Sequence, residues 1–382
     1  MTPWLDAEGY ARDREASVMK LAELLRAGEL CLFLGAGCND KLGLPLWWQL
    51  AKKCRESVSL PVDAINKGAS TETLLEKLEE FRFKAMESGE EFFFAKVAEA
   101  LYGGFHVEEN ALVMHPLLSA LGAMMMGSKR GSVREVLTLN FDNVLETYLG
   151  LHGFVARPVY RYPQLLPDND VTIYHPHGFV PHPTSEANRS DFLILDQYSY
   201  DKRHGRDWNP WLEVTRRLIE SKVFLAVGLS GKDPIMRELL TDAGERLRDE
   251  RPSGFWVLRS KQELLDTSAD IQPNEDNGNE TQPTVKNVDD PDAIGNNTGE
   301  GGIIEISDID MNMVRRNIVP LHFPNFDMCP SFLLDICQTA ARSMVRQRQH
   351  QAHPHVVRSA PVSGTGPVPP GSQPPGPSVP SS

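Results

Sequence analysis

The chain has few cysteines, and their spacing suggests neither a metal site nor a disulfide framework. There are five cysteines in 382 residues, none of them forms a Cys-x-x-Cys pair, and the number is odd. A zinc ribbon needs closely spaced cysteine pairs, and small secreted domains that depend on disulfides carry an even number of cysteines. We therefore expect reduced thiols and no bound metal.

Long apolar segments and an excess of basic residues are also missing. No apolar run approaches the roughly 20 residues that cross a bilayer, and residues 1–28 lack the apolar centre of a signal peptide. There are 39 Lys and Arg against 52 Asp and Glu, which gives a formal charge of -13. Nucleic-acid backbones are bound by clustered basic side chains. We expect a cytoplasmic protein without direct nucleic-acid or membrane binding.

What the chain does contain is a regular alternation of short apolar runs with amphipathic segments. The apolar runs predict strands at residues 30–34, 133–139, 171–174, 222–227, 254–258 and 317–323. Segments with helical periodicity separate them, and such alternation is typical of a parallel sheet covered by helices. The predicted fold class is α/β, with a Rossmann-like parallel sheet.

Changes in composition divide the chain. Residues 1–28 predict an N-terminal helix that Gly28 ends, and residues 29–345 predict one α/β domain. Within it, residues 54–126 predict a helical insertion, either a roof over a cleft or a plain packing module. Residues 265–302 are acidic with few large apolar side chains, and 346–382 are rich in Pro, Ser and Gly. These compositions predict a disordered insertion and a flexible tail.

The first predicted strand runs directly into a glycine turn, Gly35-Ala36-Gly37. Two glycines allow a sharp turn and a close approach of backbone N–H groups to an anion, so the turn predicts a phosphate cradle. Asp40 stands where a dehydrogenase fingerprint needs its third glycine, and the residues after the turn are not those of a Walker A loop. The two commonest nucleotide loops are thus disfavoured.

Three further predicted strands end in small, polar or titratable residues. Each such residue alone has an ordinary explanation as a helix cap or a turn residue. Together they predict a ligand site, because the carboxyl ends of parallel strands meet at one edge of the sheet. The candidates are Asn140, Asp142, His177, Gly228, Ser230 and Asp233.

Residues near these motifs allow other interpretations. Cys38 follows the glycine turn, but nothing in the sequence pairs it with a base, so a nucleophilic role is disfavoured. Three histidines, at 175, 177 and 182, offer a metal cluster, but prolines between them favour a rigid turn instead. We interpret Trp47 and Trp48 as core anchors more readily than as ligand contacts.

The ordered set of Gly35-Ala36-Gly37, Thr138-x-Asn140-x-Asp142, His177-Gly178 and Gly228-x-Ser230 resembles the sirtuin family. It is most similar to the sirtuin-like NAD hydrolases of prokaryotic anti-phage defence, over about residues 20–340. The four-cysteine zinc module of deacylating sirtuins is missing, and Leu139 stands where they have Gln. NAD-dependent protein deacylation is therefore the least favoured function.

The resemblance implies an NAD+ hydrolase that releases nicotinamide and ADP-ribose. It implies that Asn140 orients water or a ribose hydroxyl, that His177 is the general base, and that Asp142 helps hold the nicotinamide end. The glycine turn and Cys38 would lie at the diphosphate, and Gly228, Ser230 and Asp233 would contact ribose or phosphate. The alternative from another class is a non-catalytic subunit that senses NAD or ADP-ribose.

The resemblance also implies biological context. An NAD hydrolase harms its own cell unless it is gated, so a partner or trigger is expected. The expected role is anti-phage defence by NAD depletion, that is, abortive infection. A homo-oligomer and a HerA-type ATPase or argonaute-like partner are expected by analogy with the family alone. NAD is expected as substrate, with no metal.

Overall fold

The computed structural model describes residues 3–105, 109–127, 131–161, 164, 168–184, 186–204, 210–231, 233–259 and 308–352. The predicted acidic insertion lies outside the described residues, as does the tail beyond residue 352. The C-terminal helix α14 (Cys329–Ala352) continues past residue 345, where we expected the tail to begin.

The fold is a seven-stranded sheet in which every neighbouring pair is parallel, in the order β3-β4-β2-β1-β5-β6-β7. The strands are β1 (Leu30–Leu34), β2 (Glu135–Thr138), β3 (Ala156–Val159), β4 (Val171–Tyr174), β5 (Val223–Val227), β6 (Gly254–Arg259) and β7 (Ile318–Phe323). The predicted fold class and the six predicted strands are confirmed. The sequence reading missed β3, an edge strand with Arg157 and Pro158 in its centre.

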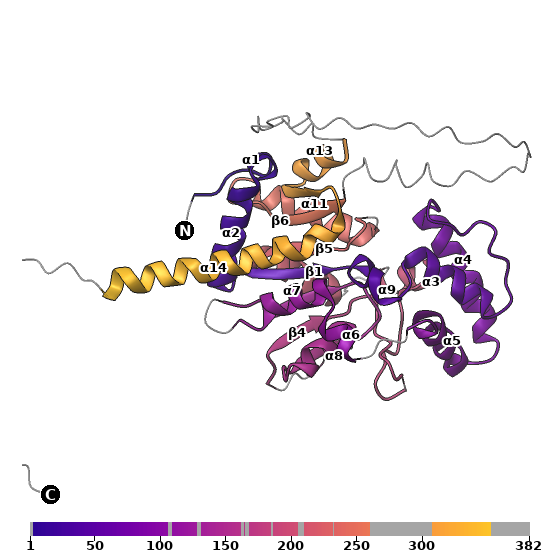
Figure 1. The fold of residues 1–382 in the computed structure, drawn as a ribbon. Helices are drawn as coiled ribbons and strands as arrows, with labels where there is room; N and C mark the ends of the chain where they lie inside the picture. Colours follow the sequence, from indigo (N-terminus) through magenta and orange to yellow (C-terminus); the bar gives the residue numbers. More distant parts are fainter. Residues whose placement is uncertain are drawn as a thin grey trace, which may run out of the picture.

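Helices cover both faces of the sheet, because its central strands are apolar on both sides. Along β1, Leu30, Leu32 and Leu34 join one buried cluster, while Cys31 and Phe33 join another. The first cluster includes α2 (Arg14–Ala27), α7 (Pro116–Met125) and α14, and the second includes α10 (Pro210–Ser221) and α11 (Pro234–Leu247). Figure 1 shows α14 running beside α2.

A separate helical group follows β1. It consists of α3 (Trp47–Glu56), α4 (Thr71–Met86) and α5 (Glu90–Tyr102), which pack on one another, and α4 also contacts α9 (Gln197–His204). Figure 1 shows this group at one end of the molecule, away from α2 and α14. Arg82 of α4 pairs with the buried Asp196 just before α9, which ties the group to the segment after β4.

The remaining helices are short or lie at the periphery. They are α1 (Ala7–Arg12), α6 (Glu109–Val113), α8 (Val144–Leu151), α13 (Asp308–Arg315) and the 3-10 helices η1 (Ala36–Leu42) and η2 (Phe326–Met328). In the part of the chain that the structure describes, no helix combines the length and apolar character needed to cross a membrane.

Candidate functional site

The loops after four neighbouring strands meet at one edge of the sheet. Strands β4, β2, β1 and β5 lie side by side in that order, and all run the same way. Their carboxyl ends lead into the loops that carry His177, Asn140, Gly35 and Gly228 respectively. The strand order also reverses between β1 and β5, which is where open parallel sheets bind their ligands.

A cavity of about 390 Å³ occupies this edge. Strand-end loops form one part of its wall, and the helical group forms another through Thr71, Leu74 and Leu75 of α4. Part of the predicted helical insertion thus lies in the wall of the cavity. The size of the cavity is that of a small-molecule site, and the cavity lining combines apolar surface with a few polar groups.

Most of the predicted site residues line this cavity, and two do not. Those that line it are Gly35, Ala36, Gly37, Asn140, His177, Gly228, Ser230 and Asp233. Cys38 and Asp142 lie outside its lining and face a separate space of about 20 Å³, together with Asn39 and His175. A space of that size has room for about one water molecule.

The glycine turn packs closely against the turn after β5, and its amides already have partners. The N–H groups of Gly35, Gly37 and Cys38 donate to the carbonyls of Val227, Gly228 and Gly35, at 3.1, 3.0 and 3.0 Å. The glycines are therefore needed for the approach of two backbone turns. Our expectation that the turn offers its row of N–H groups to a phosphate is thus wrong for these three amides.

Replacing Gly35 with alanine is expected to destabilise the protein by about 3 kcal/mol, since a Cβ there would lie 2.5 Å from the carbonyl oxygen of Gly228. Gly150, on α8, is the control, because a Cβ at that position meets nothing within 4 Å. Gly150→Ala is expected to stabilise the helix by up to about 1 kcal/mol. Urea unfolding measures both, and equal effects would contradict the turn-packing argument.

The backbone of Asn140 is fixed on both sides, and the residue lines the cavity. Its N–H donates to Thr138 Oγ1 at 3.1 Å, and its carbonyl accepts from His175 Nδ1 at 3.0 Å. Among the described residues, the Asn140 carboxamide has no hydrogen-bond partner of its own. It is therefore a donor and acceptor available to a ligand.

His177 is held by a carboxylate on the neighbouring wall. Its Nε2 lies 3.2 Å from Oδ2 of Asp233, and the same oxygen accepts from the hydroxyl of Tyr200 on α9. The other oxygen of Asp233 caps α11 by accepting from the Met236 N–H at 2.8 Å. Asp233, which we expected at the ribose or phosphate, is thus engaged with protein groups through both oxygens.

Ionisation of Asp233 fixes the tautomer of His177. Burial alone would raise the pKa of Asp233, but the nearby His177 and the hydrogen bonds from His177, Tyr200 and the Met236 N–H lower it to about 2. An ionised carboxylate only accepts hydrogen bonds, so Nε2 of His177 carries the proton on that side. Nδ1 is then the nitrogen that can take up another proton.

Asp142 is buried behind the cavity and is held within the protein. Its carboxylate accepts from Asn39 Nδ2 at 2.7 Å and from the Val144 N–H at 3.1 Å. Burial raises the pKa of Asp142 to about 6 in spite of those bonds. The role expected by resemblance, at the nicotinamide end, needs this side chain to reach the ligand, and the structure places it outside the main cavity lining.

The raised pKa of Asp142 predicts a pH dependence of stability. The folded state holds this proton up to about pH 6 and the unfolded chain loses it near 3.8, so unfolding is favoured as pH rises between those values. The Asp142 contribution to the free energy of unfolding should fall by about 3 kcal/mol over this range. Asp142→Asn should remove that slope in urea titrations, and an unchanged slope would contradict the argument.

Cys38 is buried against the β5 turn. Its Sγ donates to the Val227 carbonyl at 3.3 Å, and burial raises the pKa of the thiol well above its ordinary value. A buried thiol of this kind is a poor nucleophile. Its place is behind the glycine turn, where it packs in the core cluster.

A second cavity, of about 480 Å³, adjoins the first across the glycine turn. The two share Gly37, Leu46, Gly228 and Leu229 in their linings. The second cavity extends to the carboxyl ends of β6 and β7 and is lined there by Arg259, Asn325 and Asp327. Lys41 of η1 pairs with Asp327, which links the glycine-turn segment to η2.

Several residues of the first cavity were not identified as site residues from the sequence. Tyr200 and Lys67 lie in segments without any motif, so no spacing signal could have found them. Trp47 and Trp48 line the cavity as well as packing on the core, whereas the sequence favours core anchors over ligand contacts.

The three histidines of the 175–182 turn do not come together as a metal cluster. His175 pairs with Glu146, His177 with Asp233, and the ring of His182 lies 5.0 Å from that of Tyr102. Within the described parts of the chain, no group of three or more His, Cys, Asp or Glu side chains forms a metal-binding cluster.

The chain is similar to known proteins in three comparisons. A family model described as a SIR2-like domain matches residues 134–281. The NAD(+) hydrolase ThsA of Enterococcus faecium is 21% identical over 268 residues, which cover 67% of this chain and 48% of that protein. The chain thus spans about half the length of this relative. A solved Sir2 enzyme structure aligns at 13% identity with a TM-score of 0.41, covering 87% of this chain and 100% of that one.

The family match includes β4 and β5 and the loops that carry Asn140, His177 and Gly228. Residues 134–281 are therefore similar to a SIR2-like domain, and the resemblance to the sirtuin-like family is confirmed at that level.

Proposed function

We propose that this protein is an NAD+ glycohydrolase, which breaks the bond between nicotinamide and ribose. The observation that carries the proposal is that Asn140 and His177, from the ends of two different strands, line one cavity beside the glycine turn. An amide that can orient a water or hydroxyl and an imidazole that can accept a proton are the groups this hydrolysis needs.

The arrangement of the two cavities supports a dinucleotide as substrate. A dinucleotide has two nucleoside halves joined by a diphosphate, and here two cavities adjoin across Gly37 and Gly228. We assign the nicotinamide half to the cavity with Asn140 and His177, and the adenosine half to the cavity beside β6 and β7. Ser230 and Lys67 line the first cavity and are candidates for contact with ribose or phosphate.

The chemistry places modest demands on the protein. In NAD the nicotinamide ring is a cationic pyridinium, and it departs as a neutral molecule. Its departure therefore needs no acid, unlike that of the leaving group of an ordinary glycoside. The bonding electrons go to the ring nitrogen, water attacks the ribose carbon, and the water proton is lost to a base. Asn140 would orient the water or a ribose hydroxyl, and Nδ1 of His177 would receive the proton, with Asp233 stabilising the resulting imidazolium.

The relative supports the choice of substrate. ThsA is an NAD(+) hydrolase, and its match covers 67% of this chain. This chain spans 48% of that protein. The hydrolase activity is therefore proposed for this chain from the cavity geometry together with the relative.

Incubation of the full chain with NAD, followed by quantification of nicotinamide and ADP-ribose, tests the proposal. Equal amounts of the two products are expected. Tight binding of NAD that stays intact after long incubation would instead select the NAD or ADP-ribose sensor. Release of acyl groups from an acyl-lysine peptide, with nicotinamide, would revive the deacylase alternative.

We extend the proposal to the biological role. The hydrolase would be gated and would act in anti-phage defence by depleting NAD, as a homo-oligomer and with a HerA-type ATPase or an argonaute-like partner. These elements rest on the family resemblance alone. Nicotinamide release measured with and without each partner tests them, and equal rates in all mixtures would remove the gating step.

A further inference from the structure

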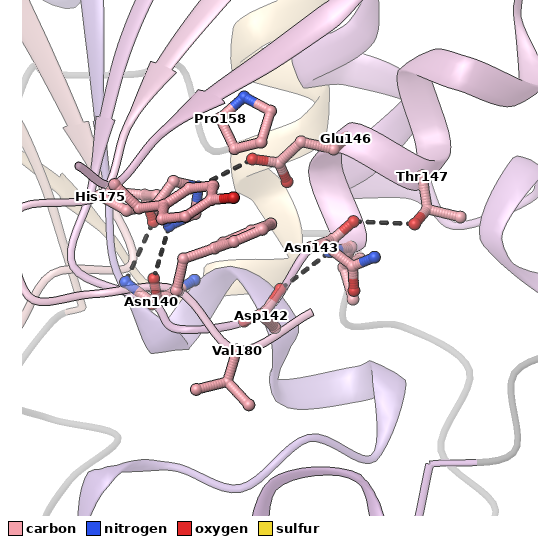
Figure 2. Close-up of polar contacts among 12 residues, drawn as sticks. Asn140, Asp142, Asn143, Glu146, Thr147, Pro158, His175 and Val180 are labelled. Atoms are coloured by element: carbon pink, nitrogen blue, oxygen red, sulfur yellow. Dashed lines mark hydrogen bonds and ion pairs between the residues drawn. The ribbon is translucent and has the colours of Figure 1, made fainter. Parts of the chain in front are cut away.

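His175 is a buried histidine that the proposed mechanism does not use. It follows β4 directly and is 1% exposed. Its Nδ1 lies 3.0 Å from the carbonyl oxygen of Asn140, and its Nε2 lies 2.8 Å from Oε1 of Glu146 on α8. Figure 2 shows the imidazole between these two groups, with one contact on each side.

The two contacts fix where the protons are. A backbone carbonyl is only an acceptor, so Nδ1 of His175 must carry a hydrogen toward Asn140. On the other side, the pair of Nε2 and the Glu146 carboxyl holds one further proton between them. Replacing a buried pair of this kind with apolar side chains often leaves the stability of a protein unchanged or raises it. A gain in stability is therefore a weak explanation for the presence of the His175–Glu146 pair.

The rest of the Asn140 loop is also held through its carbonyls. The Phe141 carbonyl accepts from the Val180 N–H at 2.7 Å, and the Asn143 carbonyl accepts from Thr147 Oγ1 at 2.9 Å. The contact from His175 holds the carbonyl of Asn140 itself, a residue that lines the ligand cavity. Without the His175 contact, the carbonyl oxygen of the peptide between Asn140 and Phe141 loses its side-chain hydrogen-bond donor.

The same short segment carries the proposed base. His177 lies two residues after His175, and its backbone carbonyl accepts from the Ile194 N–H at 2.8 Å. The contact of His175 with the Asn140 loop therefore sets the distance between the two strand-end loops that carry the proposed catalytic groups. An error of about 1 Å in such a distance costs about 100-fold in rate.

We propose that His175, held by Glu146, is a positioning residue that orients Asn140 toward the substrate and fixes its distance from His177. This inference rests on the proposed function for its rate consequences. Its structural consequence, the immobilisation of the Asn140 loop, does not depend on it. The titratable groups that line the same small space as the His175–Glu146 pair are Asp142, from the loop before α8, and Cys38.

Two substitutions at His175 separate the two contacts. Asparagine places an N–H donor where Nδ1 stands and does not reach Glu146, whereas glutamine reaches the position of Nε2 and leaves the Asn140 carbonyl without its donor. His175→Gln is expected to lower kcat about 50-fold with KM changed less than about 3-fold. His175→Asn is expected to keep kcat within about 5-fold of the wild-type value.

Hydrogen exchange of the peptide that spans residues 138–144 gives a readout that needs no turnover. Faster exchange is expected in His175→Gln than in His175→Asn, at equal urea midpoints. Glu146→Gln, which keeps a hydrogen-bonding group beside Nε2 but removes the carboxylate, should resemble the milder variant. Equal losses of kcat and equal exchange in the Asn and Gln variants would overturn the proposal.

The design distinguishes this inference from the proposed function. If the wild-type protein releases no nicotinamide with or without partners, the hydrolase proposal fails, and the exchange rates still decide whether His175 orders the loop. If turnover is present and the Gln variant is as active as the wild type, the hydrolase proposal stands and the positioning role is refuted.

Discussion

Replacing Asn140 with alanine is expected to lower kcat for nicotinamide release about 1,000-fold, while NAD affinity changes less than about 3-fold. The physical reason is that the carboxamide lines the cavity without a partner among the described residues, so it is free to bind a water or a ribose hydroxyl as the bond breaks. Its loss leaves the other residues of the cavity lining in place. Steady-state kinetics and calorimetric binding of NAD measure the two effects.

Asn169→Ala is the matched control. Asn169 is also an asparagine beside a sheet strand, but it precedes β4, at the opposite end of that strand from His177, and donates to Thr172 Oγ1 at 2.8 Å. It should keep the wild-type kcat. A modest loss of rate in Asn140→Ala, comparable to that in Asn169→Ala, would mean that the carboxamide does not act on the reacting atoms.

Replacing His177 with alanine is expected to reduce kcat about 1,000-fold, with partial recovery in added imidazole. The proposed base lines the cavity and is oriented by Asp233, so a small imidazole can occupy the space that the side chain vacates. Asp233→Asn should cost less, about 100-fold, because it keeps a hydrogen-bonding group beside Nε2 but no longer dictates the tautomer.

His152→Ala serves as control for histidine loss. His152 caps the end of α8, where its ring lies 4.8 Å from that of Tyr148, outside both cavity linings. It should leave turnover unchanged and should not respond to imidazole. If imidazole fails to restore any activity to His177→Ala while NAD still binds, a base role for this side chain is refuted, and a binding role takes its place.

The main architecture and most of the site could be predicted from the sequence, and the reason is geometric. Apolar runs that end in Gly35, Asn140, His177 and Gly228 imply buried parallel strands, and parallel strands bring such ends to one edge. The sequence order of the motifs therefore carried spatial information. That logic fails for β3, whose Arg157 and Pro158 hide an edge strand from any apolar pattern.

The partners of the site residues could not be predicted in the same way. The contact of Asp233 with His177 and Tyr200 joins three segments whose relative orientation depends on helix packing. The engagement of the Gly35 and Gly37 amides depends on how closely the β5 turn approaches, at a separation of about 190 residues along the chain. Neither set of contacts can be recognised from the spacing of residues within a short stretch of the sequence.

The location of bound NAD in the full-length Asn140→Ala variant, determined by crystallography, tests the central claim most directly. We expect one intact dinucleotide that crosses the glycine turn, with its nicotinamide ribose beside His177 and its adenosine in the cavity next to β6 and β7. A dinucleotide bound elsewhere, or one whose nicotinamide ribose is out of reach of His177, would contradict it.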